Sequence, residues 1–483
     1  MLFNYYIFIF MFLPIIFFGY FYLTSKRLVL GSKAWLVGSS LFFYSYWKPV
    51  YLPLILISIF VNYTIGTSFK KDNKLNKKNI LFIGVLFNVG LLGYFKYTDF
   101  FIENWNGIFD NNIPLAHIAL PLAISFFTFQ QIAYLVDSYK GETKEYDLLN
   151  YMLFVTFFPQ LIAGPIVHHK EMMPQFDSVR NLIKNYKNIA SGLFIFSIGL
   201  FKKVVIADTF AYWATNGFDN AVVLTFFEAW ATSLSYTFQL YFDFSGYTDM
   251  AIGIALLFNI RLPINFNSPY KAVNIQDFWR RWHMTLSRFL RDYVYIPLGG
   301  NRVSKYRNYI NLFSVFLIGG LWHGAGWTFV IWGALHGIAI VIHRIWQELD
   351  FKMHKVFAWI ITFNFVNIAW VFFRAKDIET AEKVLNGMFG ASGLTLPGML
   401  REKFIFLNEY GIEFGQFLQG VRGGYFTPVF LLGGIIFVIF LKNSFNLILL
   451  QRCNNIFIAF IVILNVFSLI NLSNYSEFIY FNF

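Results

Sequence analysis

The sequence predicts an all-α, polytopic integral membrane protein, and three observations lead to this fold class. Hydrophobic residues make up 57% of the 483 residues and charged residues 13%, against about 45–50% and about 25% in soluble globular proteins. The mean hydropathy is +0.54. Apolar runs long enough to span a bilayer recur between short basic loops. This composition excludes a soluble enzyme and a disordered chain, and we expect one continuous membrane domain over residues 1–483.

The net charge has a topological explanation. Lys and Arg total 38 and Asp and Glu 26, which gives +12. In a soluble protein such an excess would suggest nucleic acid as a partner, but here the basic residues lie in short loops, as the positive-inside rule requires. We therefore expect a lipid bilayer and no nucleic acid as partner. Cys453 is the one cysteine, so the chain has no internal disulfide and no thiolate metal site.

The first span is predicted over residues 1–25, which carry no charged side chain. The run lacks a basic start and a small-residue cleavage site, so we expect an uncleaved helix and not a signal peptide. Lys26 and Arg27 follow it, which favours an extracytoplasmic N-terminus. A lysine cluster then marks a cytoplasmic loop: Lys70, Lys71, Lys74, Lys77 and Lys78.

The remaining apolar runs predict about eleven to thirteen transmembrane or re-entrant helices in total. They lie near 35–66 (a hairpin), 80–95, 118–136, 150–167, 188–206, 222–241, 244–260, 308–321, 327–347, 356–373, 427–441 and 456–472. No internal repeat suggests the inverted halves of a secondary transporter.

Two stretches depart from this pattern. Between residues 274 and 307 apolar side chains recur at helical spacing, while arginines occupy the opposite face. This predicts an amphipathic helix that lies at the cytoplasmic interface or packs into the domain. The second stretch, about 392–425, is predicted to be a polar loop.

Histidines are the main candidates for chemistry, because an ionisable group inside a bilayer is costly and hence a functional candidate. His323 lies in GGLWHGAGW (319–327), where glycines allow close backbone approach and tryptophans wall a pocket. The pattern alone fits a catalytic His323 and a structural one bonded to a carbonyl equally well. His336 follows on the next helix, and His283 on the amphipathic stretch could simply be solvated.

Other catalytic constellations are missing from the sequence. It contains no phosphate-binding glycine loop, no GxSxG elbow and no HExxH motif. Asp243 and Asp249 are too isolated to form a predicted carboxylate pair. His168 and His169 are adjacent, a poor geometry for two ligands of one metal, so we expect no metal site. The sequence thus offers histidines as bases but no motif that supplies a nucleophile. This indicates that a histidine activates a hydroxyl group.

Several motifs resemble those of the bacterial membrane-bound O-acyltransferase (MBOAT) family. The segment YFDFSGYTDMAIG (241–253) is similar to a family signature, and further matches lie at 125–130, 158–167, 265–270, 277–293, 296–302, 321–326, 335–337 and 370–375. The resemblance is closest to the alginate O-acetyltransferase branch, which includes peptidoglycan and cellulose acetylation proteins, and it makes 241–337 the catalytic core segment. One departure is that His168 and His169 follow the 158–167 motif, where the branch has a basic residue such as Arg.

The resemblance implies roles for individual residues. His323 would lie near the centre of a membrane tunnel as general base, and His283 would orient it or share its role. His336 would either support them or pack between helices, with Trp322 and Gly324 as further supporting residues. The donor's phosphates would bind Arg280, Arg281 and Arg288, unless these arginines merely anchor their helix.

The C-terminal segment 474–483 offers a nucleophile. Its aromatic residues could form an interfacial belt, but the segment resembles a tail motif of bacterial envelope acylation systems, in which a tyrosine carries the acyl group. Tyr480 would take this role. A phenol has a pKa of about 10, so a histidine can help to remove its proton as it attacks a thioester.

The resemblance therefore implies an O-acetyltransferase of the bacterial cytoplasmic (inner) membrane. It would take acetyl from a cytoplasmic thioester, with acetyl-CoA as donor and no bound cofactor, for an envelope polysaccharide such as an alginate-like exopolysaccharide, peptidoglycan or cellulose. An extracytoplasmic or membrane-anchored SGNH-type partner would complete the transfer. Two alternatives stay open: D-alanyl transfer to teichoic acid, and a lipid or acyl transporter that makes no bond.

Overall fold

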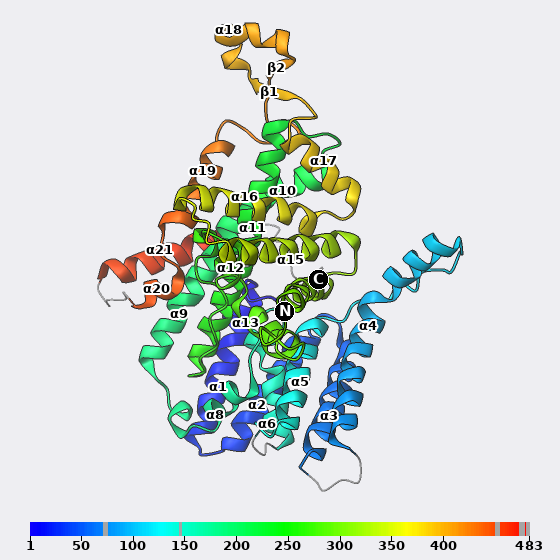
Figure 1. The fold of residues 1–483 in the computed structure, drawn as a ribbon. Helices are drawn as coiled ribbons and strands as arrows, with labels where there is room; N and C mark the ends of the chain where they lie inside the picture. The colour runs from blue at the N-terminus through cyan, green and yellow to red at the C-terminus, as the bar shows by residue number, and fades with distance from the viewer. Residues whose placement is uncertain (71–75, 144–146, 450–454, 473–478, 480–483) are drawn as a thin grey trace.

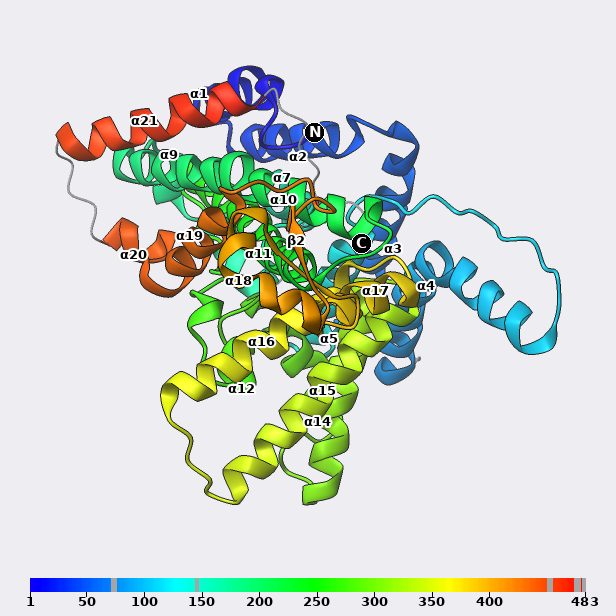
Figure 2. The same ribbon diagram turned by 90° about the horizontal axis from the view of Figure 1, so that it is seen from above.

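The computed structural model describes residues 1–70, 76–143, 147–449, 455–472 and 479. Its helices surround one long helix, α11 (Phe226–Leu257), which contacts α9, α10, α16, α17 and α19. The N-terminal helices α1 to α3, α5 and α6 form one end of the molecule, and α4 stands at its edge (Figure 1). Helices α14 and α15 run side by side and project from the rest (Figure 2).

The elements follow one another as a series of helices with one small sheet. They are η1 (Phe8–Phe12), α1 (Leu13–Ser25), α2 (Val29–Ser45), η2 (Pro49–Tyr51), α3 (Leu52–Ser68), α4 (Lys77–Phe109), α5 (Ile124–Tyr139), α6 (Leu148–Thr156), α7 (Phe158–Leu161), α8 (His169–Phe176), η3 (Val179–Leu182), α9 (Tyr186–Phe201), η4 (Lys202–Ala207), α10 (Asp208–Thr215), η5 (Asn216–Asn220), α11 (Phe226–Leu257), η6 (Pro269–Lys271), α12 (Ile275–Trp279), α13 (Met284–Leu290), η7 (Arg291–Tyr295), α14 (Lys305–His323), α15 (Trp327–Glu348), α16 (Lys355–Arg374), α17 (Ile378–Met388), β1 (Leu394–Pro397), η8 (Gly398–Leu400), α18 (Arg401–Phe404), η9 (Ile405–Tyr410), β2 (Ile412–Gly415), α19 (Thr427–Phe440), α20 (Ser444–Leu449) and α21 (Asn455–Asn471).

The helical membrane fold is confirmed. Six helical runs of the described chain are long and apolar enough to cross a membrane: Phe8–Ser25, Pro49–Ser68, Lys77–Phe109, Tyr186–Asn220, Trp327–Glu348 and Lys355–Arg374. Thr427–Phe440 and Ile458–Asn471 are shorter apolar helices. The other runs marked by hydropathy are split or less apolar; the run at 150–167, for example, divides into α6 and α7.

Helix α11 corrects one prediction, because the two expected spans at 222–241 and 244–260 form a single helix. The helix begins with a capping box between Thr225 and Glu228. The expected break fell at Asp243, whose charge is balanced by Lys203 of η4 at 2.7 Å. Both side chains are buried, at 1% and 3% exposure, so the ion pair lets a charged residue continue inside the helix.

Glycines bring two helix pairs into backbone contact. A Cβ atom on Gly199 of α9 would lie 2.5 Å from the carbonyl oxygen of Gly246 of α11. A Cβ on Gly333 of α15 would lie 2.7 Å from the carbonyl oxygen of Phe316 of α14. Small residues at such crossings are typical of membrane helix packing, and the second crossing fixes the helix that carries His323.

The prediction of an amphipathic helix at 274–307 is wrong, because the stretch does not form one continuous helix. The structure breaks it into α12, α13 and η7, with His283 between the first two at φ 43°. This left-handed backbone conformation is costly for a residue with a Cβ atom and is found where the surroundings impose it. The polar stretch 392–425 contains β1 and β2, which pair in parallel and lie with α18 at the tip of the molecule (Figure 1).

Candidate active site

His283 and His323 come together in the interior, although 40 positions separate them in the sequence. The centroids of the two imidazole rings are 6.4 Å apart, and their planes are inclined by 61°. Both residues are buried, with exposures of 0% and 3%. His323 is the last residue of α14, and His283 directly precedes α13. The two imidazoles expected to act together therefore share one buried site.

The neighbours of His283 fix its ring. Its Nδ1 atom lies 3.1 Å from Oδ1 of Asn265, and the ring packs edge-on against Phe244 of α11. Its Nε2 atom is buried and has no hydrogen-bond partner in the described part of the chain. One ring nitrogen of His283 thus contacts Asn265, while the other bonds to no described residue.

Lys96 of α4 holds the main chain at His323. Its ammonium group donates to the carbonyl oxygens of Trp322 at 2.6 Å and of His323 at 3.0 Å. It also donates to Oγ of Ser125 at 3.4 Å. The last carbonyl groups of a helix lack partners within the helix, and a cation there is favourable. Lys96 therefore closes the end of α14 that carries His323.

Aromatic side chains wall the His323 imidazole. Trp322, Trp332 and Phe373 have ring centroids 4.8, 5.2 and 5.0 Å from it. Gly324 is required here, because a Cβ atom on it would lie 2.1 Å from the ring of Phe329. The expected supporting residues Trp322 and Gly324 thus shape the wall and the turn next to His323.

His336 is placed for packing. Its Nδ1 atom accepts a hydrogen bond from the indole N–H of Trp279 at 3.2 Å. The ring is fully buried and lies 4.8 Å from Trp332 and 5.3 Å from Phe365, centroid to centroid. Its contacts match the helix-packing alternative for this residue.

The three arginines expected at the donor site differ in their surroundings. Arg288 forms a bidentate pair with Glu171, at 2.6 and 3.0 Å. Arg281 pairs with Asp277 at 2.8 Å. Arg280 is exposed. Arg288 and Arg281 are thus engaged within the protein, which matches the anchoring alternative.

His168 and His169, the departure from the family pattern, belong to a polar cluster. Tyr293 donates its hydroxyl hydrogen to Asp137 at 2.8 Å, and its oxygen lies 3.0 Å from Nδ1 of His168. Burial lowers the pKa of the His168 imidazole. His169 lies 3.6 Å from the other oxygen of Asp137. In place of the expected basic residue, His169 thus faces the carboxylate directly, and His168 contacts it through Tyr293.

Two adjoining cavities lead to His323. One, of about 220 Å³, extends from His323 and Trp332 to Arg291 and Tyr295. The second, of about 350 Å³, is also lined by Arg291 and Tyr295 and has polar walls. Its further lining residues include Gln276, Asn301, Asn308, His343 and Arg344. The two cavities thus share part of their lining, and the more apolar one reaches His323.

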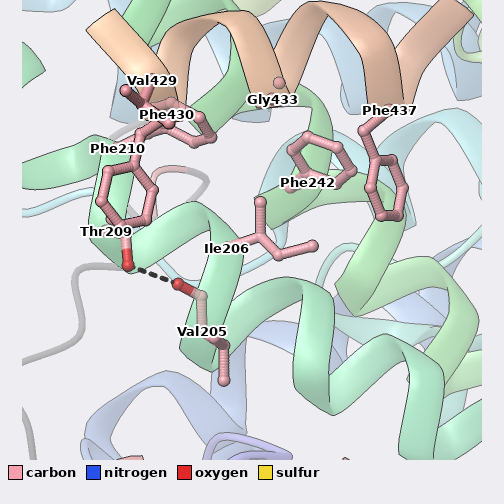
Figure 3. Close-up of a pocket in the computed structure, with 10 residues that line it drawn as sticks. Val205, Ile206, Thr209, Phe210, Phe242, Val429, Phe430, Gly433 and Phe437 are labelled. Atoms are coloured by element: carbon pink, nitrogen blue, oxygen red, sulfur yellow. Dashed lines mark hydrogen bonds between the residues drawn. The ribbon is translucent and has the colours of Figure 1, made fainter. Parts of the chain in front are cut away.

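A third cavity, of about 340 Å³, lies between η4, α10 and α19 (Figure 3). Phenylalanine side chains such as Phe210, Phe242 and Phe437 line it, and the Thr209 hydroxyl is turned to the carbonyl of Val205. Its lining has no ionisable side chain, so it offers no acid or base.

The C-terminal segment can be followed at one residue. Ile479 is buried, at 8% exposure, and its N–H donates to Oδ2 of Asp243 at 3.2 Å. Tyr480 lies outside the described residues.

Sequence reasoning missed several residues of this site. Lys96 could have been noticed as a lone charge that interrupts an apolar helix. Asn265 lay inside a recognised motif but had no assigned role. Arg291 and Arg344, which line the polar cavity, had no assigned role either.

Fold and site together define a multi-pass membrane protein with a buried histidine pair, of which His323 lines a cavity. Residues 43–376 match the model of the membrane-bound O-acyltransferase family, MBOAT. The chain belongs to this family and is an O-acyltransferase, which favours acyl transfer over the transporter alternative.

Curated relatives agree with the family assignment. The chain is 52% identical to a peptidoglycan O-acetyltransferase of Helicobacter pylori, over 100% of this chain and 98% of the relative. It is 41% identical to a probable alginate O-acetylase, AlgI, of Pseudomonas aeruginosa, over 80% of this chain and 75% of the relative. A teichoic acid D-alanyltransferase of Streptococcus thermophilus is 29% identical over 48% of this chain and 59% of the relative.

Proposed function

We propose that this enzyme of the bacterial inner membrane takes acetyl groups from cytoplasmic acetyl-CoA for O-acetylation of an envelope polysaccharide, with peptidoglycan as the first candidate. One observation carries the proposal: two buried histidines lie 6.4 Å apart, and one of them, His323, lines a cavity that shares Arg291 and Tyr295 with a more polar cavity. The relative that is 52% identical along nearly its whole length supports peptidoglycan over alginate and teichoic acid.

The donor would enter by the polar cavity. Arg344 and Arg291 line this cavity and would offer guanidinium groups for the phosphates of a nucleotide-type donor, which Arg291 would bind in exchange for its pair with Asp292 at 2.7 Å. The segments around this cavity are basic, with Arg302, Lys305 and Arg307 at the start of α14, which supports a cytoplasmic position. The narrower apolar cavity would then lead the thioester to His323.

In the transfer step a histidine removes the proton of the attacking hydroxyl group. His323 acts as general base, and His283 orients it or shares the role. With Tyr480 as first acceptor, the phenol oxygen bonds to the acetyl carbon, the C–S bond breaks, and the proton passes through the histidine to the thiolate. The products are a tyrosine acetate ester and a free thiol.

The tyrosine ester keeps the acetyl group reactive for a second transfer. Phenolate is a better leaving group than an alkoxide, so transfer from the phenol ester to a sugar hydroxyl is downhill. An SGNH-type partner, extracytoplasmic or membrane-anchored, would carry out this transfer. Ile479, the residue before Tyr480, is buried and bonded to Asp243, which supports a role for this segment inside the enzyme.

The polysaccharide can be identified in cells that lack the gene. Complementation with the wild-type chain is compared with His323→Ala, after the membrane level of both proteins has been matched. We expect alkali-labile acetyl esters on peptidoglycan to return with the wild type alone. Unchanged peptidoglycan esters, together with loss of esters from another envelope polymer, would refute peptidoglycan as the acceptor.

A further inference from the structure

Asn265 makes a dense set of contacts next to the histidine pair. It is fully buried and lies between α11 and η6. Its Oδ1 atom lies 3.2 Å from the backbone nitrogen of Thr285, 2.9 Å from Oγ1 of Thr285 and 3.1 Å from Nδ1 of His283. Three groups therefore converge on one atom of this side chain.

These contacts identify the atom as the amide oxygen. The backbone N–H of Thr285 is a donor, so its partner must be an acceptor. The Thr285 hydroxyl receives the N–H of Ile166 at 3.1 Å, which leaves its own hydrogen for Asn265. The side-chain NH₂ group cannot stand at this position, because it would face two donors.

The protonation of His283 follows. An imidazole nitrogen that faces an acceptor oxygen at 3.1 Å must carry a hydrogen. A neutral imidazole has a single N–H, so the other nitrogen, Nε2, bears a lone pair. That nitrogen is buried and without a hydrogen-bond partner among the described residues.

The backbone holds the two residues in this relation. Met284 donates its N–H to the carbonyl oxygen of Asn265 at 3.0 Å, and His283 is kept at φ 43°. The strained residue and its partner are thus tied through main chain and side chain together, as is common where function depends on geometry.

We propose that Asn265 is a positioning residue that holds His283 in the Nδ1–H tautomer and leaves Nε2 as a proton acceptor in the acyl transfer. The inference rests on the proposed function and gives the second histidine its reactive atom. The acceptor hydroxyl passes its proton to Nε2 as its oxygen bonds to the acyl carbon. The C–S bond breaks, and Nε2 returns the proton to the thiolate. The Nδ1 hydrogen stays on His283 throughout, donated to Oδ1 of Asn265.

The tautomer can be measured without any donor. Protein labelled with ¹⁵N in its histidine rings is examined by NMR in lipid nanodiscs, and His283→Gln identifies the signals of this ring. We expect the Nδ1–H pattern in the wild type and in Asn265→Asp, whose carboxylate still accepts. Asn265→Leu should shift the ring toward Nε2–H. An Nε2–H ring in the wild type would overturn the proposal, as would an unchanged tautomer in folded Asn265→Leu.

Rates of acetyl transfer complete the test. Loss of a hydrogen bond that orients an active group costs about 10- to 100-fold in activity, so we expect this loss in Asn265→Leu and rescue in Asn265→Asp. Asn367→Leu is the matched control, since Asn367 is also fully buried and bonds Thr237 and Ser233. It should leave the His283 tautomer unchanged. If no variant transfers acetyl, the proposed function fails, while the spectra still decide the role of Asn265.

Discussion

Lys96 offers a sharp test of how the site is held together. Its Nζ atom donates to the carbonyl oxygens of Trp322 and His323 at 2.6 and 3.0 Å. Lys96→Met keeps most of the side-chain volume and removes the charge and the donors. We predict that the protein still folds and that its acetyl-transfer rate falls by about 10- to 100-fold.

Stability should change little, because the energy of the lost hydrogen bonds is opposed by the cost of burying the ammonium group. Hydrogen bonds from a charged donor contribute about 1.5–3 kcal/mol each, so two of them contribute about 3–6 kcal/mol. Removing an ammonium group from water costs several kcal/mol, which methionine does not incur. Stability should therefore change by about 2 kcal/mol or less. Without the two hydrogen bonds, the main chain at His323 would no longer be held in place. A displacement of about 1 Å at a reacting group can cost about 100-fold in rate.

The assay is the initial rate of acetyl transfer from acetyl-CoA in nanodiscs, measured beside thermal unfolding. Lys33→Met is the matched control: Lys33 is also buried, and it donates to Asn150 and Asp177, outside the residues that form the site. The control should change stability without a specific loss of rate. A Lys96→Met rate within twofold of wild type, with His323→Ala inactive, would refute the reasoning.

Three further predictions concern separate parts of the account. Arg291→Ala at the polar cavity should raise the KM for acetyl-CoA about tenfold, as expected for loss of a phosphate contact; an unchanged KM would separate this cavity from the donor. Trp279→Phe removes the N–H that His336 accepts, so the free energy of unfolding should fall by about 1 kcal/mol, and equal thermal stability would contradict this bond. Gly333→Leu should abolish the monodisperse peak in size-exclusion chromatography because its Cβ would lie 2.7 Å from a backbone oxygen, whereas Gly90→Leu, with open space around it, should leave the peak intact.

The sequence predicts the membrane helices best where apolar residues run without interruption. Helices α15 and α16 lie within one or two residues of the predicted runs at 327–347 and 356–373. The sequence predicts two spans in place of helix α11, with a break at Asp243. The lysine that neutralises this carboxylate lies 40 positions earlier and contacts it only in the folded chain. Local hydropathy cannot report such a pairing.

The site shows the same limit. Residue types and the family resemblance placed His283 and His323 together, but the groups that hold them come from distant segments. Lys96 reaches the end of α14 across more than 220 positions. Arg288 is engaged by Glu171, 117 positions away, and this pair could not be foreseen from the arginine-rich face. The break at His283 depends on Asn265, which no helical periodicity reveals.

The acyl relay itself is tested most directly by intact-mass analysis of the C-terminal peptide after incubation with acetyl-CoA. Wild type, Tyr480→Phe and His323→Ala are compared at equal levels of folded protein. We predict one added acetyl group on Tyr480 in the wild type, none in Tyr480→Phe, and a loading rate at least about 100-fold lower in His323→Ala. Acetyl loading at the wild-type rate in His323→Ala, or transfer to glycan by Tyr480→Phe, would contradict the account.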